Sequence, residues 1–203
     1  MHRKMSSKNI QKFEDLLVFI VSNFSNNGTL TPTKLWKLFY FCEAGFYEKN
    51  KRTITGVDYF KNNYGPTPDQ KISEKALKEV GKYINTEKIK KDDGKTITVF
   101  DAKPNTEYKF QSIGADEIEE ARNICGKYFQ LSVEDICLLA HKDPPYLGAD
   151  KSEKGDRIDF DFVFYRDPKD DEDFIEKSAS IKKVNPVSVE GVRGLIDYVR
   201  KNP

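Results

Sequence analysis

Histidine, cysteine and tryptophan are scarce in this sequence of 203 residues, which contains two, three and one of them. The three cysteines (Cys42, Cys125 and Cys137) are odd in number, scattered and never in a Cys-x-x-Cys pair, which argues against a disulfide framework and a zinc finger. Each falls within a helical apolar pattern, which favours reduced core thiols. The best pair of metal ligands is Cys137 with His141, four residues apart on one helix face. No second histidine lies nearby, so we expect a core thiol and a hydrogen-bonded histidine at a helix end, and no metal.

Long apolar runs and an excess of one charge are also missing. No run approaches the ~20 residues that span a bilayer, and Met1-His2-Arg3-Lys4 is not followed by a secretory apolar stretch. We therefore expect a cytoplasmic protein with no membrane partner. The 34 Lys and Arg residues against 33 Asp and Glu give a net charge of +1, so the composition as a whole does not favour nucleic acid.

The sequence contains no serine elbow, no phosphate-cradling glycine loop and no dinucleotide-binding fingerprint. A cysteine hydrolase would need a thiolate in a polar, accessible position, whereas all three cysteines lie on apolar stripes. We therefore predict a protein that is not an enzyme, with no catalytic residue and no cofactor.

The most apolar stretch of the sequence predicts a central helix from Thr31 to about Lys49. Thr31 can cap it, and Pro32 suits its first position. At 100° per residue, one face and an adjoining one are almost entirely apolar or aromatic: Leu35, Leu38, Phe39, Cys42 and Phe46, then Trp36, Tyr40 and Tyr47. A helix this apolar usually has partners on several sides.

Two residues of this helix depart from the pattern. Glu43 falls inside the apolar arc, where an unpaired carboxylate would be very costly. It either holds a loop through hydrogen bonds or serves as a catalytic acid; we favour the loop, with Tyr64-Gly65-Pro66 or His141 as its partner. Phe41 interrupts the narrow polar strip made by Lys34, Lys37 and Glu48, and we expect it to be exposed.

The rest of the chain predicts an α+β fold that is mainly α: amphipathic helices around the central one, with a small antiparallel hairpin or three-stranded sheet. We expect a helical domain over 8–150 and a C-terminal extension over 151–203. The predicted elements are a helix over 10–24 stopped by Asn26-Asn27-Gly28, a helix from a Thr67-Pro68-Asp69-Gln70 capping box to Tyr83, a sheet within 87–113, helices over 118–128 and 132–142, a strand over 157–165, a mobile charged segment over 167–186 with a helical turn near Phe174, and a last helix over 188–199 packed on the domain.

Two binding roles stay open on this evidence. The first two helices and the hairpin could form a winged helix whose lysines contact DNA phosphates, namely Lys34, Lys37, Lys88, Lys90, Lys91 and Lys95. Against this, the would-be recognition helix is too apolar for a wet groove. Protein binding is the alternative, because several tyrosines have the rings with polar tips that anchor interfaces: Tyr40, Tyr47, Tyr59, Tyr64 and Tyr146.

Two blocks of the sequence resemble a known family. The run from Leu35 to Ala44 (LWKLFYFCEA), then Gly56 to Tyr59 and Tyr64-Gly65-Pro66, is similar to the signature of the SocA-like antitoxins, the Panacea domain. Leu131-Ser132 followed by His141-Lys142-Asp143-Pro144-Pro145-Tyr146 is similar to the family's second block. Tyr146 stands where a tryptophan is more usual, and Asn62-Asn63 precede the turn. The resemblance also implies a helix after Ile158, in conflict with the strand predicted from alternation.

The resemblance implies a non-enzymatic, largely helical domain that neutralises a cognate protein toxin in a bacterial or phage toxin–antitoxin pair, either by steric block or by handing the toxin to a protease or its adaptor. It implies a toxin-docking surface near the central helix and the Tyr64-Gly65-Pro66 turn, held from behind by Glu43 and His141. The candidate structural and partner-binding residues are Phe41, Glu43, Tyr47, Tyr59, Tyr64, Gly65, Pro66, His141 and Tyr146.

Overall fold

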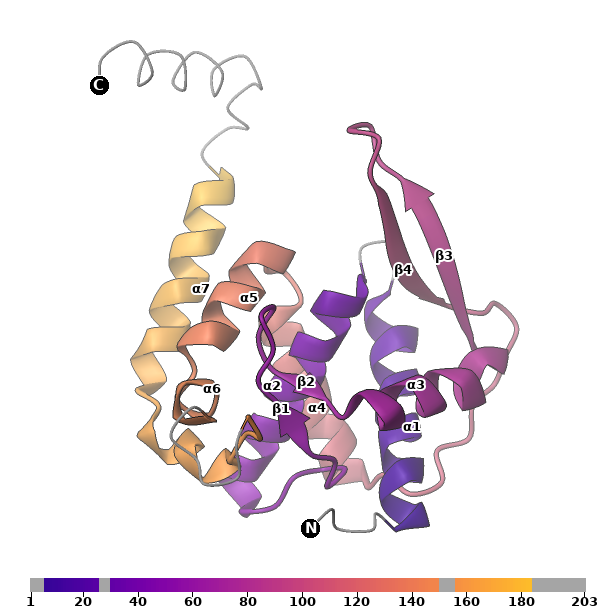
Figure 1. Ribbon diagram of the computed structural model, residues 1–203, viewed down its shortest axis with the longest axis horizontal. Coiled ribbons are helices and arrows are strands. Elements are labelled where there is room, and N and C mark those ends of the chain that lie inside the picture. The colour runs from indigo at the N-terminus through magenta and orange to yellow at the C-terminus, as the bar shows by residue number, and fades with distance from the viewer. Residues whose placement is uncertain (1–5, 26–29, 150–155, 184–203) are drawn as a thin grey trace. The chain divides into compact units, whose positions relative to one another are not determined.

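The computed structural model describes residues 6–25, 30–149 and 156–183 (Figure 1). They divide into two compact units between Asp167 and Pro168. The first unit contains α1 (Ser7–Phe24), α2 (Pro32–Asn50), β1 (Tyr59–Phe60), β2 (Thr67–Pro68), α3 (Gln70–Glu79), η1 (Val80–Lys82), β3 (Ile84–Lys90), β4 (Thr96–Ala102), α4 (Ala115–Tyr128), α5 (Val133–Lys142), α6 (Pro144–Gly148) and η3 (Phe160–Tyr165). The predicted fold class, α+β and mainly α, is confirmed.

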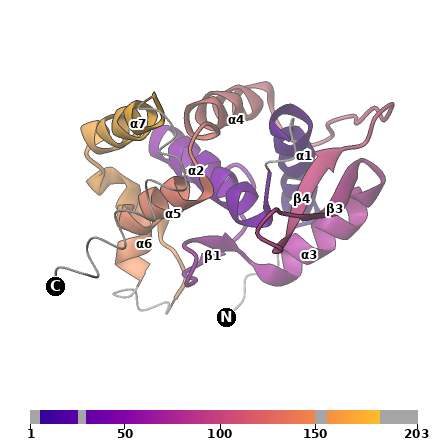
Figure 2. The same ribbon diagram turned by 90° about the horizontal axis from the view of Figure 1, so that it is seen from above.

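Helix α2 is the centre of the first unit. The Thr31 side chain caps it by accepting from the Lys34 amide, as predicted, and Lys51 in the left-handed conformation ends it. Figure 2 shows α2 between α1 and α4 on one side and α5 on the other, and it also contacts η3. The prediction of a central apolar helix surrounded by other helices is therefore correct.

The prediction of a solvent-exposed polar strip on α2 is wrong, because this side of the helix is covered as well. Phe41 is only 2% exposed and stacks on Tyr128, with ring centroids 4.4 Å apart. Lys34 is buried, with its Nζ 4.4 Å from the centroid of the Phe129 ring, and Lys37 is completely buried. The helix is thus enclosed on the side that the sequence assigned to solvent.

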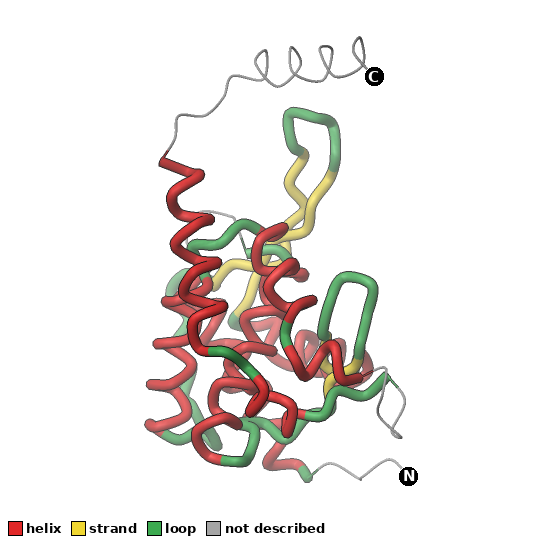
Figure 3. The backbone as a smooth tube through the Cα atoms, turned by 90° about the vertical axis from the view of Figure 1, so that its left-hand side faces the viewer, coloured by secondary structure: helices red, strands yellow, loops and turns green. Residues whose placement is uncertain are grey.

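The predicted sheet within 87–113 is a two-stranded antiparallel hairpin, and its third strand is absent from the described residues. Strands β3 and β4 pair from Ile84 with Ala102 to Lys90 with Thr96. The base of β4 contacts α1 and α2, and the tip of the hairpin projects from the first unit (Figure 3). The segment after it is held by a side chain instead of a strand. The buried Asp15 carboxylate accepts from the amides of Gln111, Ser112 and Ile113 at 3.1, 2.7 and 3.0 Å.

The strand predicted over 157–165 is also wrong. Arg157 makes one isolated bridge with Phe60, and η3 follows. Phe160 and Val163, three residues apart, are the buried positions of η3, as the period of a 3-10 helix requires, whereas Phe164 is exposed. The helix after Ile158 that the family resemblance implied is therefore the better prediction.

Two further predictions need correction, one on the cap of α3 and one on the segment after residue 167. Asp69, and not Thr67, caps α3 by accepting from the Ile72 amide, because Thr67 and Pro68 form β2. In the second unit, residues 168–183 form α7 (Pro168–Lys183) and not the predicted mobile segment. The predicted last helix over 188–199 and the Asn26-Asn27-Gly28 stop lie outside the described residues. No helix within the described ranges is long and apolar enough to cross a membrane.

Candidate partner-binding surface

The turn between β1 and β2 presents an aromatic side chain to solvent, beside the exposed Asn62 and Asn63. The strands pair at Tyr59 with Pro68 and Phe60 with Thr67, and the Gly65 amide closes the turn on the Asn62 carbonyl at 2.8 Å. Tyr64 is 72% exposed, whereas its neighbours Gly65 and Pro66 are buried. An aromatic side chain is therefore held outward on an anchored turn.

Lys37 of α2 anchors the turn from inside. Its Nζ donates to the Pro66 carbonyl at 2.8 Å. Burial lowers the pKa of Lys37 to about 8, because a charged ammonium is disfavoured away from water. Gly65 has a φ of +89°, and a Cβ at this position would lie 2.8 Å from Lys37 Cε. Glycine is thus required here both for backbone conformation and for the approach of the lysine.

Helices α5 and α6 hold the other end of the turn. The Tyr146 hydroxyl donates to the Asn62 carbonyl at 2.9 Å, and the Cys137 thiol faces the Tyr64 carbonyl at 3.8 Å. His141 packs edge-on against the Tyr146 ring, with centroids 4.9 Å apart. The structure thus brings together Tyr64, Gly65, Pro66, His141 and Tyr146, five of the residues that the sequence singled out.

Glu43 holds a loop, but a different one from the one predicted. Its carboxylate accepts from the amides of Ile54 at 2.6 Å and Thr55 at 3.2 Å, and also from the Thr55 hydroxyl. It is completely buried. Burial raises its pKa to about 7, while the hydrogen bonds from Thr55 and Ile54 oppose that rise. The predicted partners, the Tyr64-Gly65-Pro66 turn and His141, are wrong.

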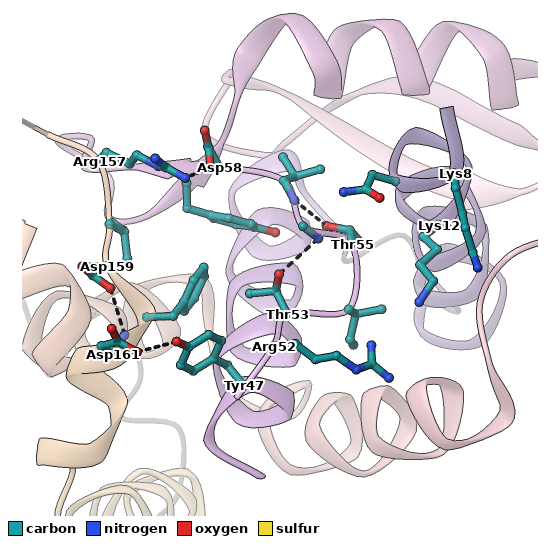
Figure 4. A pocket seen from close by; sticks show the side chains of 17 residues that line it. Lys8, Lys12, Tyr47, Arg52, Thr53, Thr55, Asp58, Arg157, Asp159 and Asp161 are labelled. Carbon is teal, nitrogen blue, oxygen red and sulfur yellow. Dashed lines mark hydrogen bonds and ion pairs between the residues drawn. The ribbon is translucent and has the colours of Figure 1, made fainter. Parts of the chain in front are cut away.

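The loop that Glu43 holds forms one wall of an open cleft of about 560 Å³ (Figure 4). The other walls are the start of α1, with Lys8 and Lys12, and the segment from Arg157 to Asp161. Tyr47 and Tyr59 line this cleft and not the surface around Tyr64. Tyr59 is completely buried, and its hydroxyl has no hydrogen-bond partner among the described residues.

A family model, described as "Antitoxin SocA-like, Panacea domain", matches residues 35–146, more than half of the chain. The chain belongs to the SocA-like antitoxin family. No curated protein and no solved structure gives a significant match.

The match to the SocA-like domain spans α2, the anchored turn and the helices that hold it, from Leu35 to Tyr146. The segment over 157–161, which closes the cleft, lies beyond the matched residues. Within the described residues, no group of three or more His, Cys, Asp or Glu side chains is placed to hold a metal ion.

Lys37 was predicted to lie on an exposed polar strip, although the sequence held a signal for its burial. Its neighbours one turn further along α2 are Tyr40 and Phe41, and a lysine beside two aromatic residues on a nearly apolar helix is a candidate for burial. The cleft was not predicted either, because the three segments that form it are far apart in the chain, and the Gly56 to Tyr59 part of the family signature does not show which segments it faces.

Proposed function

We propose that this SocA-like protein is an antitoxin that binds and neutralises a cognate protein toxin by non-catalytic contact, and that the toxin docks on the surface around Tyr64. The observation that supports the proposal most strongly is an exposed tyrosine on a turn fixed by Lys37, Cys137 and Tyr146. Aromatic side chains held rigidly in the open bind partners at a small cost in conformational entropy.

Two exposed leucines are chain neighbours of residues that hold the turn. Leu138 directly follows Cys137 and is 52% exposed, and Leu147 directly follows Tyr146 and is 53% exposed. Each leucine therefore comes next in the chain to a residue that holds the turn. Exposed apolar side chains of this kind are available for a protein interface, in which the tyrosine is the type of residue enriched at the centre.

The thiols support a non-enzymatic role in a reducing compartment, which we take to be the cytoplasm. Cys42 and Cys125 are buried with their Sγ atoms 3.5 Å apart, and burial raises the pKa of Cys42. Burial also raises the pKa of Cys137. Protonated thiols are poor nucleophiles, so these cysteines fit a structural role.

The burial of α2 argues against the DNA-binding alternative. Lys34 and Lys37 are buried, and α2 is covered by α1, α4, α5 and η3, so it has no free face for a groove. The hairpin lysines Lys88, Lys90, Lys91 and Lys95 are exposed. A DNA-binding role would show as an affinity that falls steeply with salt concentration.

The proposal is tested by co-expression with the small open reading frame adjacent to the gene. The intact protein should restore growth and co-purify with that product. Tyr64→Ala should abolish both while leaving the circular dichroism spectrum unchanged. Tyr165→Ala is the matched control, because Tyr165 is 75% exposed and lies on η3. Full neutralisation by Tyr64→Ala, or an equal loss in both variants, would place the interface elsewhere.

A further inference from the structure

The cleft between α1, the 52–59 loop and the 157–161 segment is not used by the proposed docking surface. Its volume of about 560 Å³ falls within the roughly 300–1,000 Å³ typical of small-molecule sites. Its floor includes Ile54, Val57 and Phe160, and its rims are charged. A cleft of this size with convergent polar groups is a candidate ligand site in its own right.

One rim of the cleft is cationic. Lys12 Nζ and Arg52 Nη1 both bind the same oxygen of Glu117, at 2.5 and 2.6 Å. Asp116 adds a distant, exposed contact to Arg52 at 3.9 Å. Lys8, one turn before Lys12, has no ion pair with any residue in the described ranges, and Figure 4 shows all three cations on the same side of the cleft. Three cations against two carboxylates favour an anionic group on this rim.

The opposite rim offers hydrogen-bond acceptors and an aromatic ring. Asp161 accepts a hydrogen bond from the Tyr47 hydroxyl through one carboxylate oxygen, and its other oxygen has no hydrogen bond to the described part of the chain. The Tyr47 ring lines the cleft and is partly exposed. Figure 4 places Tyr47 and Asp161 side by side, across the cleft from Lys8. A carboxylate beside an aromatic ring suits a flat group with N–H donors at its edge.

One residue that lines the cleft has an unsatisfied polar group in the core. Tyr59 lines the cleft, and its buried hydroxyl lacks a partner among the described residues. A buried polar atom without a partner is uncommon in native proteins. Burial raises the pKa of this hydroxyl, and the charged and polar groups that raise it further are Glu43, Cys42 and Tyr40 of α2, so it faces the central helix and takes no part in the binding proposed below.

We propose that this cleft binds a small molecule of the nucleoside monophosphate type. Its phosphate would contact Lys8, Lys12 and Arg52, and its amino-bearing ring would lie against Tyr47 with N–H groups donating to Asp161. This site is independent of toxin binding, since it shares no residue with the surface around Tyr64.

The test is titration of the intact protein by calorimetry and by amide NMR with three probes: AMP, inorganic phosphate and adenosine. AMP should bind, with shifts confined to residues 8–12, 52–59 and 157–161. Phosphate and adenosine should each bind at least about tenfold more weakly, because each lacks one half of the recognised chemistry.

Variants locate the binding groups. Lys8→Glu should weaken AMP binding about tenfold, since it reverses an exposed charge beside the phosphate. Asp161→Asn should reduce the preference for AMP over phosphate. Lys78→Glu, an exposed lysine of α3 outside the cleft, is the matched control and should bind AMP normally.

The proposal fails if AMP does not bind, if phosphate or adenosine binds as tightly as AMP, or if Lys8→Glu binds unchanged. Neutralisation of a toxin by a protein that ignores AMP would overturn this inference and leave the proposed function intact.

Discussion

Lys37 and Pro66 are joined by a hydrogen bond of 2.8 Å from a completely buried ammonium to a backbone carbonyl. This bond connects the central helix to the turn that presents Tyr64. Burial of an ammonium with one protein partner among the described residues costs free energy, because most of its hydration is lost. The connection makes the geometry of the turn sensitive to the charge of one side chain.

The first prediction concerns pH. The pKa of Lys37 is about 8 in the folded protein, against an ordinary value of 10.5. Between these values the unfolded chain holds a proton that the native protein has released, so stability should rise with pH. From pH 8 to about 9.5 the gain is up to about 2 kcal/mol. Urea unfolding at several pH values measures it, and Lys37→Met should lack the effect. If the free energy of unfolding changed with pH in the same way in the unmodified protein and in Lys37→Met, the prediction would be wrong.

The second prediction concerns Glu43, whose raised pKa has the opposite consequence. Between 4.5 and about 7 the native protein keeps a proton that the unfolded chain has lost, so this residue's contribution to stability falls as pH rises through that window. Glu43→Gln keeps the shape without the titration and should remove this slope.

Glu43→Ala tests the scaffold role of the same residue. It leaves the amides of Ile54 and Thr55 without their acceptor and should cost about 2–4 kcal/mol. Thermal unfolding measures the cost. Toxin neutralisation should persist at temperatures where the variant is folded. A variant of normal stability that had lost neutralisation would instead make Glu43 part of the interface.

The features that the sequence predicted correctly are mostly local. Thr31 caps α2 as expected, and the helix predicted to start at Ser132 is capped by that residue, because a cap depends on residues within one turn. The burial of Glu43 also followed from its angle on the helix. Its partner did not, since the approach of the Ile54–Thr55 loop is decided by tertiary packing. The prediction that Phe41 is exposed is wrong for the same reason, because α4 covers the strip on which Phe41 lies.

The segment over 157–165 shows a second kind of limit. Ile158, Phe160, Phe162 and Phe164 alternate as in a strand, yet strand formation needs a partner edge, and among the described residues only Phe60 provides one bridge. Burial of Phe160 with Val163 decides in favour of a 3-10 helix. Periodicity alone therefore could not predict the cleft that this segment lines.

The fourth prediction concerns a buried ionic cluster behind α2. Asp143 accepts from the Tyr40 hydroxyl at 2.7 Å and from Arg166 Nε at 2.8 Å, and a second Arg166 nitrogen also binds it. Arg166→Met leaves a carboxylate that is only 6% exposed without its cation, which should cost about 3–5 kcal/mol. Arg122→Met, at an exposed arginine of α4, should change stability by less than about 0.5 kcal/mol. If chemical denaturation gave equally small changes in the free energy of unfolding for the two variants, the ionic cluster would not be formed in solution.

The last prediction separates backbone strain from steric contact at the anchored turn. Gly65 and Gly94 both have positive φ, +89° and +81°, but only Gly65 has neighbours within reach of an added Cβ. Gly94→Ala in the β3–β4 hairpin should therefore cost about 1 kcal/mol from conformation alone. Gly65→Ala adds the contact with Lys37 Cε at 2.8 Å, so it should cost more and should also displace the turn. We expect neutralisation to be lost with Gly65→Ala and kept with Gly94→Ala, as measured by growth on co-expression beside urea unfolding. Similar losses of stability in the two variants would mean that Lys37 moves aside freely, and the turn would then not be anchored by that residue.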